Sequence, residues 1–133
     1  MGEEEIENIK NYWENMATHD HKTMLASFKS KEYSSALFFG HIVLEKILKS
    51  LFVKENRRQA PYSHDLPYLN SELKSGLSAK EKNLLIKIND FNIRARYPDV
   101  KLEFYKKCTL DYTRKRIKEI DSIYQKICKK LKQ

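Results

Sequence analysis

An aspartate stands where the first amphipathic stretch of the sequence should present an apolar side chain. Residues 3–30 carry apolar side chains at three- and four-residue steps, and Asp20 falls in a gap of that stripe. A carboxylate that faces a protein core is costly unless a cation pairs with it. We therefore expect a buried cation beside Asp20, and Lys46 and Arg96 are the candidates. The alternative is a half-exposed Asp20 at the rim of the core.

The longest apolar run, residues 33–53, is interrupted by the titratable side chains of His41, Glu45 and Lys46. The run would be apolar on nearly every side of a helix, and such a helix is buried against several neighbours. At about 1.5 Å per residue it would span roughly 30 Å, the width of a small domain. We therefore expect the other helices to pack around it.

The remaining patterns predict helices rather than strands. Only three glycines and three prolines occur, which favours long helices with few turns. Ser78 and Glu81 form a capping box, and Pro98 ends the helix that follows at about Arg96. The sequence therefore predicts an all-α, up-and-down bundle of about five helices in one domain, residues 1–133. The expected helices are 3–30, 33–53, a short helix capped by Ser63 or His64 that ends near Gly76, then 78–96 and 102–131.

Most common enzyme classes have no signature in this chain. Its three glycines cannot form a phosphate-binding loop, and no HExxH, CxxC or GxSxG motif occurs. His19 and His21 are two residues apart and would point to different sides of a helix. Cys108 and Cys128 would lie roughly 30 Å apart on the predicted last helix, too far for a disulfide. We therefore expect no metal and no cofactor.

The net charge of +8 is concentrated near the end of the chain. Residues 101–133 hold 11 Lys and Arg against 4 Asp and Glu, whereas residues 1–100 hold 15 against 14. A basic helix of this kind could bind nucleic acid or an acidic partner, although a solvated lysine-rich face is the favoured interpretation. No segment has the features of a membrane span, a signal peptide or a transit peptide, so we expect a cytoplasmic protein without membrane contact.

Three stretches, taken together, resemble the prokaryotic HEPN domain. The first is the long apolar helix with His41 and Glu45-Lys46, and the second is His64-Asp65-Leu66 after a basic loop. The third is FNIRARYPD at residues 91–99. The resemblance covers about residues 5–130, and the Arg-Tyr-Pro-Asp run is its most specific part.

The resemblance implies a helical bundle that commonly forms a homodimer. It also implies a small cytoplasmic protein that is often encoded beside a minimal nucleotidyltransferase, in pairs that resemble toxin–antitoxin systems. Many HEPN domains are metal-independent endoribonucleases whose motif is Arg, four to six residues, then His. Other members lack this motif and are thought to bind nucleotides or to act as scaffolds.

The nuclease motif matches this chain only at Arg58 and His64, or at Arg57 and His64, in the loop before the third helix. The windows after Arg94 and Arg96 contain no histidine. A histidine can act as general acid or base on a ribose 2′-hydroxyl, and an arginine can hold the phosphate. A capping or core-rim role for His64 is nevertheless the favoured interpretation.

The favoured function is therefore a non-catalytic homodimer that binds a nucleotide, a nucleotidyltransferase partner, or both. In such a pocket Lys46 and Arg96 would hold phosphate, and Tyr97 could stack on a base. The competing interpretation of the same residues is a buried ion-pair network that fixes helix register. A ribonuclease and a purely structural interaction module are the alternative functions. The residues of the expected pocket or network are Asp20, His41, Glu45, Lys46, Arg94, Arg96, Tyr97 and Asp99.

Overall fold

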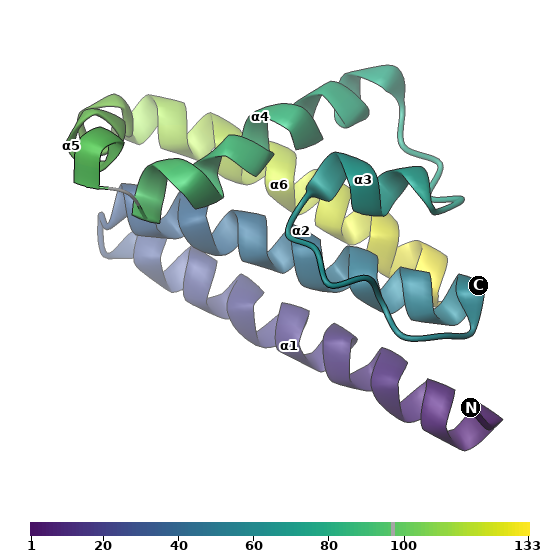
Figure 1. The fold of residues 1–133 in the computed structure, drawn as a ribbon. Helices are drawn as coiled ribbons and strands as arrows, with labels where there is room; N and C mark the ends of the chain where they lie inside the picture. Colours follow the sequence, from purple (N-terminus) through teal and green to yellow (C-terminus); the bar gives the residue numbers. More distant parts are fainter. Residues whose placement is uncertain (97) are drawn as a thin grey trace.

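The computed structural model describes residues 1–96 and 98–133, with side chains up to residue 95 and from residue 101 (Figure 1). Its described residues form six helices and no strand, which confirms the predicted all-α class. The helices are α1 (Glu3–Lys29), α2 (Tyr33–Asn56), α3 (Leu66–Ser71), α4 (Ala79–Arg96), α5 (Pro98–Lys107) and α6 (Leu110–Leu131).

Helix α2 is the centre of the bundle. It contacts each of the other five helices, and α1 runs antiparallel beside it along much of its length (Figure 1). Most of its apolar side chains are buried, as the apolar run of the sequence predicts. At roughly 25 cal/mol for each Å² of apolar surface removed from water, this burial is the main term that stabilises the fold.

A glycine lets α2 approach two neighbouring helices closely. A Cβ atom built at Gly40 would lie 2.5 Å from Cδ1 of Ile120 on α6 and 3.4 Å from the sulfur of Met24 on α1. Any larger residue would therefore press into the buried Ile120 side chain and touch Met24. Gly40 marks the point where α1, α2 and α6 meet.

The start of α4 forms as the capping box predicts. The Ser78 backbone N–H donates to Glu81 Oε1 at 2.8 Å, and the Glu81 N–H donates to Ser78 Oγ at 3.1 Å. Lys126 on α6 also donates to Glu81 at 2.8 Å, so the cap ties α4 to α6. The helix ends at Arg96, where Pro98 in the sequence indicates its end.

The short helix α3 differs from the expectation at both ends. Its N-cap is Asp65, whose carboxylate accepts a hydrogen bond from the Tyr68 N–H at 3.2 Å; neither Ser63 nor His64 takes that role. The helix ends at Ser71 and does not reach Gly76. Gly76 instead adopts a positive φ of 73° in the connection to α4, a conformation that glycine tolerates.

The predicted last helix, 102–131, is two helices. The break falls at Cys108 and Thr109, and the Thr109 side chain caps α6 by accepting a hydrogen bond from the Tyr112 N–H at 3.3 Å. A threonine can compete with helical backbone bonds in this way, which makes it an effective N-cap. The chain therefore turns a corner between α5 and α6, and the two cysteines do not share a helix.

Candidate functional site

Asp20 on α1 and Lys46 on α2 lie together as an ion pair. The Lys46 ammonium donates to Asp20 Oδ2, and the Asp20 side chain is only 9% exposed. His19, itself exposed, approaches the other Asp20 oxygen at 3.3 Å. The cation beside Asp20 is thus Lys46, one of the two candidates from the sequence.

A second polar cluster surrounds the buried carboxylate of Glu45. Lys49 Nζ lies 3.0 Å from Glu45 Oε2, and His64 Nδ1 lies 2.8 Å from Glu45 Oε1. Lys49 also sits 5.1 Å from the centroid of the Trp13 ring on α1. Sequence reasoning gave Lys49 no role, although Glu45 and Lys49 stand at the i, i+4 spacing of a helical ion pair.

His41 joins the same region through the backbone of the loop before α3. Its Nε2 lies 3.0 Å from the carbonyl oxygen of His64, which can only accept, so Nε2 carries the proton. Burial lowers the pKa of His41, and the nearby Glu45 carboxylate opposes that effect. His41 is therefore a neutral hydrogen-bond donor that fastens the loop to α2.

Arg58 and His64 do not share a contact in the described part of the chain. The Arg58 guanidinium lies 4.9 Å from the centroid of the Phe52 ring. The His64 ring, 65% exposed, is held by Glu45. Arg57 is also engaged elsewhere, in an ion pair with Glu3 at the start of α1.

Arg94 is the one predicted site residue of the FNIRARYPD stretch whose side chain lies among the described residues. It forms an ion pair with Asp90, one turn earlier on α4. The neighbouring Arg96, Tyr97 and Asp99 side chains lie outside the described residues.

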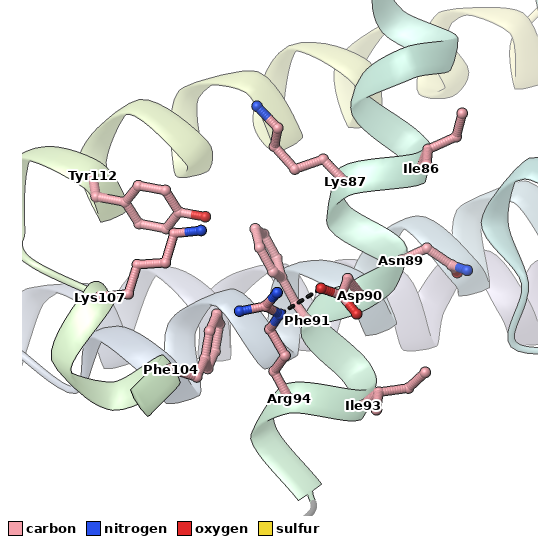
Figure 2. Close-up of a pocket in the computed structure, with 10 residues that line it drawn as sticks. All are labelled: Ile86, Lys87, Asn89, Asp90, Phe91, Ile93, Arg94, Phe104, Lys107 and Tyr112. Carbon is pink, nitrogen blue, oxygen red and sulfur yellow. Dashed lines mark hydrogen bonds and ion pairs between the residues drawn. The ribbon is translucent and has the colours of Figure 1, made fainter. Parts of the chain in front are cut away.

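Arg94 also lines a cleft of about 500 Å³ between α4, α5 and α6. Three cationic side chains, Lys87, Arg94 and Lys107, line it together with the Tyr112 ring. Arg94, Lys107 and Tyr112 extend into the same space, and Lys87 lies at its edge with its ammonium turned away from Arg94 (Figure 2). Phe91 and Phe104 form part of its wall, with ring centroids 5.5 Å apart. A cavity of this size is in the range of small-molecule sites.

Tyr112 is flanked by cations. Lys107 Nζ lies 5.3 Å, and the Arg116 guanidinium 5.4 Å, from its ring centroid. Burial raises the pKa of Tyr112, with Arg116 acting in the opposite direction, so the side chain is a neutral phenol at pH 7. It can therefore donate a hydrogen bond into the cleft.

Sequence reasoning missed Lys87, Lys107 and Tyr112. The reason is the corner at Cys108 and Thr109, which brings the end of α5 and the start of α6 to the same side of α4. The available signal was Thr109, a good N-cap residue, followed by Asp111 in a first helical turn.

No group of three or more His, Cys, Asp or Glu side chains in the described part of the chain is placed to hold a metal ion. None of its helices is both long enough and apolar enough to cross a membrane.

The chain was compared with known proteins and structures. No curated protein matches it. Its fold is similar to that of TT1696 from Thermus thermophilus, with a TM-score of 0.79 and 19% sequence identity over 92% of this chain and 98% of that one. The model of the HEPN domain family matches residues 11–133. The chain therefore belongs to the HEPN domain family.

Proposed function

We propose that this HEPN domain is a non-catalytic homodimer that binds a nucleotide, a minimal nucleotidyltransferase partner, or both, in a toxin–antitoxin-like pair. The observation that carries the proposal is the separate engagement of Arg58 and His64. Arg58 lies over Phe52, whereas His64 is held by Glu45. Catalysis on one phosphodiester needs both groups at that site, so this arrangement supports binding over cleavage.

The paired state of Lys46 bears on where a nucleotide would bind. A phosphate would have to displace the buried Asp20 carboxylate from the Lys46 ammonium, whereas at Arg94 it would compete only with the half-exposed Asp90 carboxylate. This favours the second half of α4 and the residues that follow it, with Arg94 and Arg96 on the phosphates and Tyr97 stacked on the base. Arginine suits that role because its planar fork matches phosphate oxygens.

Calorimetric titration with ATP and with GTP tests the nucleotide part of the proposal. Binding of either nucleotide is the expected result, and absence of heat with both removes this part. Light scattering of the purified protein tests the homodimer, for which the expected mass is twice 15.9 kDa. Co-expression with a nucleotidyltransferase encoded beside it, followed by size exclusion, tests the partner.

A second candidate function, a metal-independent ribonuclease, is favoured by one contact. Glu45 Oε1 lies 2.8 Å from His64 Nδ1, and this leaves Nε2 of the exposed ring directed away from the carboxylate. A carboxylate that orients a histidine in this way is a common feature of general-base sites. Cleavage of RNA in EDTA that is lost in both His64→Ala and Arg58→Ala would establish the ribonuclease, and intact RNA would exclude it.

A further inference from the structure

The cleft between α4, α5 and α6 is lined by three cations and by one carboxylate, Asp90, which neutralises only part of their charge. In the described part of the chain, neither Lys87 nor Lys107 pairs with a carboxylate, and only Arg94 does so, with Asp90. Like charges that line one cleft repel each other, and low-dielectric walls strengthen their combined field. Binding of an anion relieves that repulsion.

The donors in the cleft are suited to several phosphate oxygens rather than to one carboxylate. Lys87 comes from the middle of α4, Arg94 from near its end and Lys107 from the end of α5, so the cations reach the cleft from different sides (Figure 2). The Tyr112 phenol adds a neutral donor. Lysine ammonium groups bind phosphate as point charges, and an arginine adds a planar pair of donors.

The cleft also has an apolar part. Ile86 and Ile93 line it and are 60% and 51% exposed, which is high for isoleucine on a helix that packs against a core. A ligand with a polyphosphate chain and a flat, weakly polar ring would use both parts of the cleft.

We infer that this cleft is the binding site for a nucleoside polyphosphate, with Lys87, Arg94 and Lys107 on the phosphates and Ile86 and Ile93 beside the base. The inference rests on the nucleotide part of the proposed function and assigns it to a site. It differs from a site centred on Lys46, whose partner Asp20 is buried, whereas Asp90, the partner of Arg94, is half-exposed.

Calorimetric titration of the full chain with ATP, inorganic tripolyphosphate and adenosine tests the ligand class. We expect ATP to bind most tightly, tripolyphosphate to bind more weakly, and adenosine to give no measurable heat. Added KCl should weaken ATP binding because exposed charges are screened. Binding of adenosine as tight as that of ATP would overturn the assignment of the cations to phosphate.

Charge-reversal variants test the location. Lys87→Glu and Lys107→Glu should each weaken ATP binding by about tenfold or more, since each removes a charged contact and adds a repulsive one. The matched control is Lys129→Glu, an equal change of charge on the exposed surface of α6. Residue 129 lies 17 positions beyond Tyr112, roughly 25 Å along the helix axis, and its variant should stay within about twofold of the wild type.

The outcomes separate this inference from the proposed function. ATP binding that persists unchanged in Lys87→Glu and Lys107→Glu overturns the cleft assignment and leaves nucleotide binding intact. Loss of binding in Lys46→Ala, with the cleft variants unaffected, also overturns it and points to the region near Asp20. A wild-type protein that binds neither ATP nor tripolyphosphate contradicts both. Circular dichroism melting of each variant confirms that it is folded.

Discussion

Gly40 and Ile120 approach so closely that a Cβ on residue 40 would lie 2.5 Å from Cδ1 of Ile120. Gly40→Ala should therefore destabilise the protein by about 1 kcal/mol. Overpacking costs typically 1–3 kcal/mol, and the better helix propensity of alanine offsets up to about 1 kcal/mol of that. Urea unfolding monitored by circular dichroism measures the change.

The same contact provides its own control. Ile120→Val deletes Cδ1, the atom that the new Cβ would strike. In the Ile120→Val background, Gly40→Ala should become neutral or stabilising, because only the propensity gain of about 1 kcal/mol remains. Equal costs of Gly40→Ala in both backgrounds would contradict a steric origin.

Removal of one partner of the Asp20–Lys46 ion pair should strongly destabilise the protein. Lys46→Met leaves a carboxylate buried without its cation, and the free energy of unfolding should fall by roughly 3 kcal/mol. Asp20→Asn combined with Lys46→Met removes the stranded charge and should recover part of this loss. Urea unfolding of the two single variants and the double variant measures the coupling. If the double variant loses as much free energy of unfolding as the two single variants added together, the result would argue against the ion pair.

Lys54 on α2 should hold the end of α6 in place. Its ammonium donates to the carbonyl oxygens of Lys130 at 3.2 Å and Leu131 at 2.9 Å in the last helical turn, where few backbone donors remain. Lys54→Met should lower the free energy of unfolding by about 1–2 kcal/mol. Hydrogen exchange of the α6 amides should also become faster near the C-terminal end. Lys129→Met, an exposed lysine in that turn, should leave both measurements nearly unchanged.

His41 should make the protein less stable as the pH falls below neutral. Its pKa in the folded protein is lowered from 6.5, mainly by burial. As the pH falls through 6.5, the unfolded chain therefore takes up a proton before the folded protein does, and the free energy of unfolding decreases. The decrease ends below the folded pKa, where both states are protonated.

His41→Gln should flatten this part of the pH profile, because glutamine does not titrate but can still donate to the His64 carbonyl oxygen. Urea unfolding at a series of pH values from neutral to mildly acid measures the slope. An unchanged slope in His41→Gln would assign the pH dependence to other groups.

The sequence predicts those parts of the fold that depend on local spacing. The apolar run of residues 33–53 identifies the central helix, and Ser78 and Glu81 identify the start of α4. The corner at Thr109 escaped prediction because the apolar stripe of residues 102–131 continues across it. Helical periodicity indicates which side of a helix is apolar. It cannot show a two-residue break at which the helix axis changes direction.

Within the candidate site, only the ion pair of a buried charge could be predicted from the sequence. Asp20 in an apolar stripe requires a cation, which limits the choice to a few residues, and Lys46 is the one beside it. The cationic cleft offered no such constraint, because exposed lysines such as Lys87 and Lys107 satisfy local rules anywhere on a helix surface. Their convergence depends on how α4, α5 and α6 are arranged in space.

The central position of α2 also determines how the molecule can come apart. Since every other helix rests on it, no group of helices can detach and keep a core of its own. The protein should therefore unfold as one cooperative unit, with the same midpoint by circular dichroism and by fluorescence of Trp13. A ligand that binds only the folded form would then protect all six helices at once, including those that it never touches.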